Sequence, residues 1–398
     1  MPQTNPAPSG ASDRPVHAAA PNRGRGSVNT LHSRLNPTCI RRIERPDSVQ
    51  TLRRLLRRTE ADGVPVCIAG GRHAMGGQQF ASGAVLIDMT AMDRVLAFDA
   101  HKGHIDVEAG ICWPELLAWL ARVQRDRQPQ WGIRQKQTGA DRISIGGTLS
   151  ANAHGRGLNM KPFVDDVESF TLLGADGRIR TCSRDRNSEL FALAIGGYGL
   201  FGIIVTVRLR LMRRTKMQRL VSVIDLTELV AAVEDRVATG CLYGDFQFAI
   251  DPLSDDFLRK GIFSCYQPIR DNAVMPTRQK ELHAEDWTHL LYLAHVHKSR
   301  AFEIYSRHYL STHRQRYWSN SHQLSEYLDD YHRWASRRQV QSCYPEFARF
   351  LELKMQYDPG ERFQSEWYRH YKSMFADALE SADVGAAISR EPVFPGVP

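Results

Sequence analysis

The sequence predicts an α+β protein, and three features of its pattern carry that prediction. Short apolar and β-branched stretches pair across turns that favour hairpins, such as Asp176-Gly177. Helical stretches with one apolar face lie between these hairpins and do not alternate regularly with strands. A glycine-rich loop follows an early apolar strand. Together they favour antiparallel sheets mixed with helices over a regular parallel alternation.

The first third of the chain is predicted to begin with a helix and two buried strands. Asp47 or Ser48 can cap a helix whose apolar residues recur on one face, and Gly63 can end it. VPVCIA, residues 64–69, and VLID, residues 85–88, have the continuous apolar character of buried strands. The glycine-rich loop follows the first of these strands directly.

Two hairpins and a helix are predicted next. Residues 94–109 hold two strand patterns joined by a turn that ends at Gly103. Pro114 stands at a position that favours the first turn of a helix. Residues 165–182 form the second hairpin, across the Asp-Gly pair at 176–177.

GYGLFG, residues 197–202, matches the pattern G-x-G-x-x-G. A dinucleotide-binding fingerprint of that form needs a strand before it and a helix after it. Here a predicted helix at 189–195 precedes the glycines, and a strand pattern at 203–211 follows them. The segment is therefore predicted to be a tight turn and not a nicotinamide-nucleotide site.

The pattern changes beyond residue 211. Strands are predicted at 220–226, 243–251 and 262–269, and the chain is helical from Leu282 onward. Eight of the fifteen histidines lie between residues 283 and 332, without H-E-x-x-H or comparable ligand spacing. We expect them to pack beside the many aromatic rings, and we expect no metal site.

Composition limits the class of protein. The 398 residues carry a formal net charge of +8, which suits an anionic cofactor, an acidic substrate or nucleic acid, but no nucleic-acid motif accompanies it. No apolar run approaches the roughly 18 residues of a membrane helix. Residues 1–35 lack the apolar core of a secretory signal and are expected to be a disordered tail. The seven dispersed cysteines, without a C-x-x-C pair, fit the reducing cytoplasm.

The loop AGGRHAMGGQQF, residues 69–80, holds four glycines and one histidine, His73. Glycine permits close approach to the main chain and left-handed backbone angles. Such a cluster can be a plain turn or a cradle whose N–H groups face a phosphate. The loop alone leaves both interpretations open.

Five segments in order resemble the FAD-binding domain of the vanillyl-alcohol oxidase flavoprotein family, also called the PCMH-type FAD domain. They are IAGGRHAMGG, VEAG at 107–110, QTGADRISIGGTLSANAHGRG at 137–157, DVESFTLLGADGRI at 166–179 and ELFALAIGGYGLFGIIVTVRL at 189–209. The resemblance covers roughly residues 36–213. It implies an FAD-linked oxidase or dehydrogenase whose glycine loop wraps the FAD pyrophosphate with backbone N–H groups.

The resemblance also implies which residues contact the cofactor. The pyrophosphate would be held by Gly70, Gly71, Arg72, His73, Ala74, Gly76 and Gly77, with Gln78 adding a side-chain contact. The isoalloxazine and ribityl groups would lie along Thr138, Gly139, Gly146, Gly147, Asn152, Ala153 and His154, and the adenine beside Gly202, Ile203 and Ile204.

His73 falls where many family members bond the flavin covalently through its 8α-methyl carbon. A neutral imidazole nitrogen is a nucleophile near pH 7, so the chemistry suits this residue. The position from which some members make a second, cysteine bond holds Ala140 here, so we expect no double attachment. Ala153, where relatives can gate oxygen access, favours a dehydrogenase.

The resemblance divides the chain into a tail at 1–35, an FAD-binding domain at 36–213, a substrate or cap domain at 214–340, a closing segment at 341–375 and a tail at 376–398. The cap shows only about three strands and is expected to be shortened or incomplete. A base is needed for hydride transfer from a C–H beside a hydroxyl. The polar candidates for such catalysis are Tyr331, His332, Lys354 and His370.

Three functions remain open from the sequence. The first is an FAD-dependent oxidoreductase that oxidises an alcohol, lactone or similar small molecule and passes electrons to oxygen or a redox partner, with a flavin-dependent alkene reductase as its reverse form. The second is an FAD-binding protein with a degraded cap and little or no catalysis. The third is charge-driven binding of nucleic acid, which we do not expect. The sequence does not indicate the oligomeric state.

Overall fold

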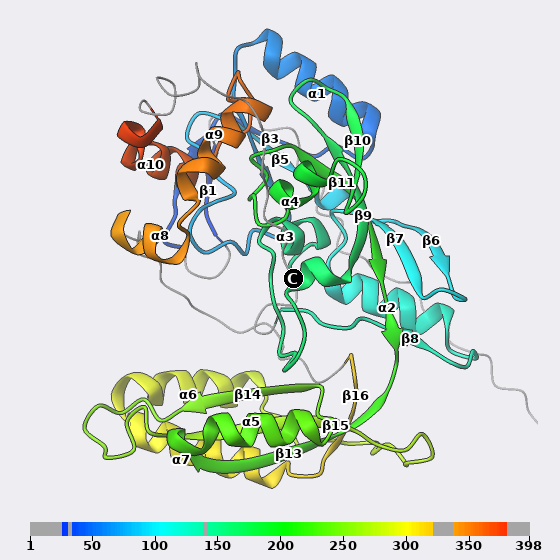
Figure 1. Cartoon of the computed structure of the whole chain (residues 1–398), viewed down its shortest axis with the longest axis vertical. Coiled ribbons are helices and arrows are strands. Elements are labelled where there is room, and N and C mark those ends of the chain that lie inside the picture. Colours follow the sequence, from blue (N-terminus) through cyan, green and yellow to red (C-terminus); the bar gives the residue numbers. More distant parts are fainter. Residues whose placement is uncertain (1–25, 31–33, 138–141, 321–336, 380–398) are drawn as a thin grey trace, which may run out of the picture.

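The computed structural model describes residues 26–30, 34–137, 142–320 and 337–379. It shows an α+β protein in two parts (Figure 1). The larger part combines residues up to about 213 with the C-terminal helices, and the smaller part is a sheet with helices on both of its faces. No helix of the described residues is long and apolar enough to cross a membrane. The seven cysteines all lie in the described ranges and are free thiols.

A small parallel sheet begins the larger part. β3 (Arg42–Glu44) and β4 (Val66–Ala69) flank β5 (Val85–Asp88), and α1 (Val49–Ala61) covers them with Leu52, Leu55 and Leu56. The predicted helix is confirmed, and Ser48 is its N-cap because its hydroxyl accepts a hydrogen bond from the amide of Thr51.

The expected tail at 1–35 includes a short strand, which corrects that prediction in part. β1 (Gly26–Val28) pairs antiparallel with β2 (Thr38–Ile40), and Val28 is buried in a small cluster with Ile40. Residues 1–25 of the expected tail lie outside the described residues, as do residues 380–398 of the second one.

The central sheet of the larger part is antiparallel and has the order β10-β9-β11-β7-β6. Its strands are β6 (Val95–Asp99), β7 (His104–Glu108), β9 (Val167–Leu173), β10 (Ile179–Ser183) and β11 (Ile203–Arg210). Both predicted hairpins are present, and Gly103 and Gly177 take positive φ angles of 68° and 71° at their turns. A two-residue pairing joins β8 (Trp131–Gly132) to β12 (Met212–Arg213).

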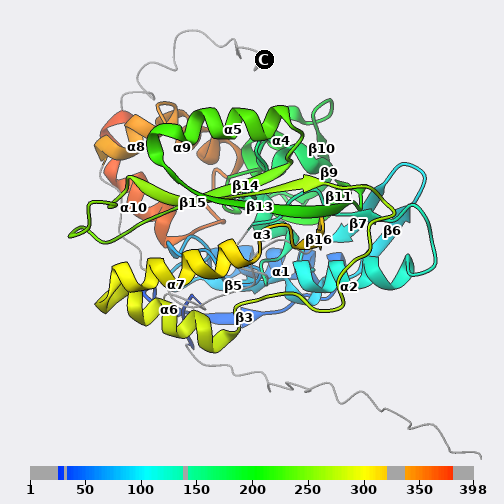
Figure 2. The ribbon, with the colours of Figure 1, turned by 90° about the horizontal axis from the view of Figure 1, so that it is seen from below.

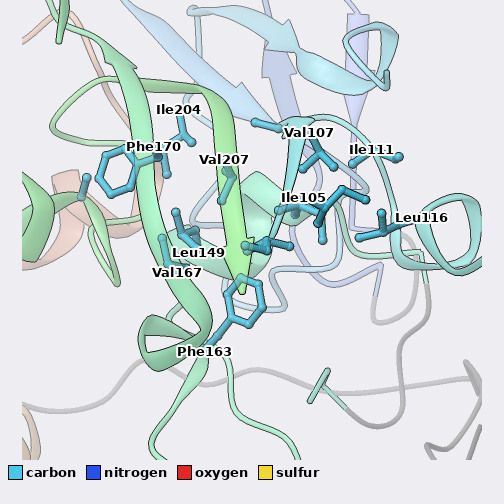
Figure 3. Close-up of a cluster of buried hydrophobic side chains, with 14 of the residues drawn as sticks. Ile105, Val107, Ile111, Leu116, Leu149, Phe163, Val167, Phe170, Ile204 and Val207 are labelled. Atoms are coloured by element: carbon cyan, nitrogen blue, oxygen red, sulfur yellow. The ribbon is translucent and has the colours of Figure 1, made fainter. Parts of the chain in front are cut away.

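The main hydrophobic core lies between this sheet and α2 (Trp113–Val123), α3 (Ile145–Ser150) and α4 (Ser188–Ala194). Figure 3 shows Phe163, Phe170 and Leu149 meeting side chains of β7 and β11 in this core. GYGLFG connects α4 to β11, so a helix precedes it and a strand follows it, as the sequence predicts. Short 3₁₀ helices cover Met89–Ala91, Phe163–Asp166 and Leu226–Glu228.

The smaller part is a four-stranded antiparallel sheet of order β14-β15-β13-β16. It contains β13 (Lys216–Asp225), β14 (Tyr243–Phe248), β15 (Lys260–Pro268) and β16 (Arg316–Trp318). β16 lies in a region that we expected to be helical, because three residues are too few to give a recognisable strand pattern.

Alternation of side chains across this second sheet lets helices pack on both faces (Figure 2). Phe263 and Cys265 pack against α5 (Leu229–Ala238), whereas Val221 and Ile262 pack against α7 (Lys298–Ser311). α6 (Ala284–Val296) lies beside α7.

The C-terminal segment returns to the larger part, where α8 (Arg337–Cys343), α9 (Phe347–Tyr357) and α10 (Glu366–Met374) pack against Leu200 and Phe201. Between α9 and α10 the carboxylate of Asp358 is buried. It accepts hydrogen bonds from Lys354 Nζ at 2.5 Å and from the amides of Arg362 and Phe363. Burial of these charges requires such complete pairing.

The two parts meet along the edge of β14. The amide of Gly244 donates to Arg156 O at 2.9 Å, and the amide of Leu158 donates to Leu242 O at 3.0 Å. The Tyr243 hydroxyl crosses to the larger part and donates to Arg134 O. Residues 156–158 therefore cover the first half of that strand edge, which otherwise exposes unpaired backbone groups.

Asp166 lies buried behind this junction, 3.2 Å from Arg134 Nη1. Burial raises its pKa to about 6, although Arg134 opposes the shift. Its neighbour Asp165 is more exposed, and the hydrogen bond from Arg134 lowers its pKa. Asp166 therefore keeps its proton to a higher pH than Asp165 does.

Because the folded-state pKa of Asp166 exceeds its ordinary value of 3.8, its stability contribution is full below about pH 4 and is lost as the pH rises through 6. We expect Asp166→Asn to match the wild type at pH 3 and to exceed it at pH 8 by roughly 2–3 kcal/mol of unfolding free energy. Urea unfolding followed by circular dichroism measures both.

Asp165→Asn is the matched control. Its folded-state pKa is lowered, so the substitution should destabilise the protein near pH 7, and the loss should shrink as the pH falls. Parallel pH profiles for the wild type and Asp166→Asn would contradict the assignment of a raised pKa to Asp166.

Candidate cofactor site

The glycine loop after β4 lies against the segment that leads into α3, at a distance that excludes side chains. A Cβ atom on Gly70 would lie 1.9 Å from Ser144 Oγ, and one on Gly71 would lie 2.0 Å from Arg142 O. Only glycine fits both positions. Ser144 is also the N-cap of α3, since its hydroxyl accepts the amide of Gly147 at 3.1 Å.

A cavity of about 340 Å³ lies between the loop, α3 and the turn that leads into β11. None of its described lining residues is acidic, and Arg72 and His73 are its basic side chains. The lining consists of Ile68, Ala69, Gly70, Gly71, Arg72, His73, Ala74, Met75, Gly76, Gln78, Gln79, Met89, Ala109, Gln137, Ile143, Ser144, Gly146, Gly147, Ser150, Ala151, Tyr198, Gly199, Gly202 and Ile204.

Backbone donors of the loop are available to a ligand. The loop turns through Arg72 and Gly77, whose φ angles are +59° and +69°. Within the described ranges, the amides of Gly71, Ala74 and Gly76 donate no hydrogen bond to the protein. Left-handed residues within such a loop turn successive N–H groups towards one side, an arrangement that suits an anion.

Two glutamines leave buried polar atoms unpaired at the cavity. Gln79 is buried, and neither its amide oxygen nor its amide nitrogen has a hydrogen-bond partner among the described residues. Gln78 Oε1 is likewise unpaired, and its amide folds over Gly76, where a Cβ would lie 2.7 Å from Gln78 Nε2. Unpaired buried amides cost free energy, which a polar ligand would recover.

The C-terminal segment supports both ends of the loop. Phe363 forms a parallel bridge with Val66 in β4, before the loop. After the loop, the amide of Glu366 donates to Phe80 O, and its carboxylate accepts the amide of Ser82, each at 2.5 Å. In α10, Trp367 packs on Tyr198 of the cavity wall with ring centroids 5.3 Å apart.

Most residues that the resemblance assigned to the cofactor line this cavity. Those that do are Gly70, Gly71, Arg72, His73, Ala74, Gly76, Gln78, Gly146, Gly147, Gly202 and Ile204. Those outside the lining are Gly77, Asn152, Ala153, His154 and Ile203, whereas Thr138, Gly139 and Ala140 lie outside the described residues.

The structure gives reasons for two of these differences. Ile203 points away from the cavity into the core under α1, because only alternate residues of β11 face one side. Asn152 has a φ of 42° and its side chain accepts the amide of Val164, so it holds a turn.

The catalytic candidates are not brought together at the cavity. Tyr331 and His332 lie outside the described residues. Lys354 is fully buried in its ion pair with Asp358, and His370 lies on α10, so neither lines the cavity. Their catalytic roles stay predictions. The burial that lowers the pKa of Lys354 belongs to the C-terminal turn.

Sequence reasoning missed Gln79, Ser144, Ser150 and Tyr198 of the lining. Gln79 lies in the glycine-rich loop at 69–80 and Ser144 in the segment at 137–157, so their place in these segments was a usable signal. Tyr198 lies in GYGLFG, of which only Gly202 was assigned to the cofactor, and it lines the cavity with a φ of 49°.

Comparison with known proteins agrees with this geometry. A family profile described as an FAD binding domain matches residues 40–183. The chain carries an FAD-binding domain of the PCMH-type FAD-linked oxidase family. FAD is the cofactor of this domain, and a cavity with unpaired amides and no carboxylate among its described lining residues suits the negatively charged diphosphate.

Three relatives resemble the FAD-binding domain. An uncharacterized oxidoreductase, ORF5 in the fasciation locus of Rhodococcoides fascians, is 33% identical over 42% of this chain and 36% of its own length. Cytokinin dehydrogenase 4 of Oryza sativa subsp. japonica is 29% identical over 52% and 38%, and L-gulonolactone oxidase of Bos taurus is 32% identical over 45% and 39%. The matched stretch thus spans less than two fifths of these relatives.

We expect Gly71→Ala to weaken FAD binding about ten- to a hundredfold, because the added methyl group would push the loop away from Arg142 O. The flavin-to-protein ratio of purified protein measures the effect. Gly360→Ala is the control, since its Cβ would lie 3.7 Å from the nearest atom, Arg362 Cγ. Equal flavin content in Gly71→Ala and wild type would contradict the role of this close approach.

Proposed function

We propose that the chain is an FAD-dependent oxidoreductase that oxidises an alcohol, lactone or similar small molecule. The observation that carries the proposal is the cavity, whose free amides and unpaired glutamines suit FAD and whose described lining holds no carboxylate. The relatives named cytokinin dehydrogenase and L-gulonolactone oxidase support redox chemistry, although the match covers only part of each.

When bound, FAD would accept a hydride from a C–H bond beside a hydroxyl group. The residues of the chain would hold it. The amides of Gly71, Ala74 and Gly76 would donate to the diphosphate, with Arg72 adding positive charge. The buried side-chain amide of Gln79 would form hydrogen bonds with the cofactor. Tyr198, which packs on Trp367, would form one wall of the cavity.

The smaller part would be the substrate domain. We propose that it is a shortened cap, because its described residues form one four-stranded sheet with three helices. Tyr331 and His332 remain candidates for the base that takes the hydroxyl proton, since they follow this sheet in the chain and flank the C-terminal segment. The oxidant that accepts the electrons would be oxygen or a redox partner.

We expect purified protein to show flavin absorption with about one FAD per chain, and anaerobic addition of a substrate alcohol or lactone to bleach it. A panel of small alcohols and lactones, read at the flavin band and followed by admission of oxygen, makes the test. Oxygen-dependent recovery of colour indicates an oxidase, and recovery only with a dye indicates a dehydrogenase.

Colourless, folded protein that takes up no added FAD would overturn the cofactor assignment. If the protein binds one FAD per chain and dithionite bleaches it, but no alcohol or lactone of the panel does, the oxidoreductase function would be overturned. That result would favour an FAD-binding protein with an inactive cap. Colour that returns only on addition of an alkene would favour the reductase.

We further propose that His73 bonds the flavin covalently. His73 lines the cavity beside Gly71, with its Cδ2 3.0 Å from the position a Gly71 Cβ would take. A neutral imidazole nitrogen there can act as the nucleophile. We expect the yellow colour to stay with the protein pellet after acid denaturation, and to enter the supernatant for His73→Ala.

His154→Ala is the control for this prediction, because His154 is exposed and outside the cavity lining. Its flavin should remain in the pellet. Free FAD released by acid from the wild type would contradict the covalent bond and leave FAD binding itself intact.

A further inference from the structure

A second cavity, of about 250 Å³, lies in the smaller part and shares no lining residue with the FAD cavity. Its walls come from β14 and the residues after it, from α6 and from α7 (Figure 2). The described lining consists of Gln247, Phe248, Ile250, Trp287, Leu290, Leu291, Ala294, Ala301, Phe302 and Tyr305.

The lining of this second cavity is apolar and uncharged. Eight of its ten residues have aliphatic, phenyl or indole side chains. The rings of Trp287 and Tyr305 face each other with centroids 6.0 Å apart. Burial raises the pKa of Tyr305 well above its ordinary value, so its hydroxyl stays neutral. An ionised ligand would lose its hydration here without gaining an opposite charge.

One polar group in the lining has a defined orientation. Gln247 Nε2 donates to Asp245 Oδ2 at 2.8 Å, and a carboxylate can only accept, so the amide cannot be flipped. Among the described residues, the side chain of Gln247 makes this one hydrogen bond, and its Oε1 accepts none. A ligand with a hydroxyl or N–H group could donate a hydrogen bond to this amide oxygen.

The rim of the cavity leaves apolar side chains exposed. Phe248 is 38% exposed and Ile250 is 43% exposed. Contiguous apolar surface around a pocket with one convergent polar group is typical of a small-molecule site. A volume of about 250 Å³ suits a molecule of one or two rings.

We propose that the second cavity binds a neutral, one- or two-ring apolar molecule that donates one hydrogen bond to the amide oxygen of Gln247. The rings would lie among Trp287, Phe302 and Tyr305. The site is separate from the FAD cavity, so the proposal goes beyond the oxidoreductase function and does not depend on it.

The probe is 1-naphthol, which is neutral at pH 7, has two rings and donates one hydrogen bond. Its binding to the full-length, FAD-loaded protein is measured by calorimetry, with 1-methylnaphthalene as the analogue without a donor. We expect 1-naphthol to bind at micromolar concentration and about fivefold or more tightly than the analogue. Dissociation constants above the millimolar range for both would overturn the proposal.

Two substitutions test the location. Ala294→Phe adds a ring inside the cavity and should weaken 1-naphthol at least tenfold, whereas His289→Phe adds the same ring to an exposed position on α6 and should leave binding unchanged. Gln247→Leu should abolish the preference for 1-naphthol over 1-methylnaphthalene. Equal affinity in wild type and Ala294→Phe would overturn the site.

The flavin spectrum, recorded in the same titration, separates this proposal from the oxidoreductase function. Displacement of FAD by 1-naphthol, together with unchanged binding in Ala294→Phe, would place the probe in the FAD cavity and overturn the second site. If Ala294→Phe removes the binding of 1-naphthol, the second site is supported. This conclusion holds whether or not any alcohol or lactone bleaches the flavin.

Discussion

The close approach of residues 70–71 to residues 142–144 is the constraint on which the FAD-binding domain depends. A side chain at either glycine would collide with Ser144 Oγ or Arg142 O. This contact joins the parallel sheet of β3, β4 and β5 to the helix α3, which packs in the other core. It also shapes the cavity, because the loop must turn back through Arg72 and Gly77 with its amides unpaired. Because residues 70 and 71 are glycines without side chains, the loop can take this path, and its backbone N–H groups are available to a ligand.

The loop would be poorly held by this contact alone, since it has few internal hydrogen bonds. The C-terminal segment supplies further contacts: Phe363 pairs with Val66 before the loop, and Glu366 binds Phe80 and Ser82 after it. That segment is itself fixed by Asp358, which ties α9 to the turn through Lys354 and two amides. A buried ion pair about 290 residues away in the chain therefore contributes to the geometry of the glycine loop, through backbone contacts and not through the ligand.

The sequence predicted the larger part well because its signals are local. Hairpin turns at Gly103 and Gly177, the cap at Ser48 and alternating apolar strands each require only neighbouring residues. The smaller part was harder. β16 has three residues, and Gly26–Val28 was assigned to a tail because its partner strand begins ten residues later. The spacing of Lys354 and Asp358, four residues apart, indicates that the two side chains lie close together, but it does not indicate that both are buried. Tyr198 was missed because its contact with Trp367 joins segments far apart in the chain.

The two cavities differ in the charge that they accept, and this difference follows from their construction. The FAD cavity is built from backbone amides with Arg72, so it suits an anion. The second cavity is built from side chains of two helices and a strand, so it can be apolar, with Gln247 as an oriented acceptor. A short chain of polar contacts leads from the second cavity to the larger part: Gln247 donates to Asp245, which lies 3.4 Å from Arg156, and Arg156 belongs to the segment after α3. Burial opposes the charge of Arg156, yet Asp245 and nearby tyrosines raise its pKa, so it stays charged. Because this arginine also joins the edge of β14 to the larger part, a ligand that fixes Gln247 would restrain the same junction that positions the smaller part beside the FAD-binding domain.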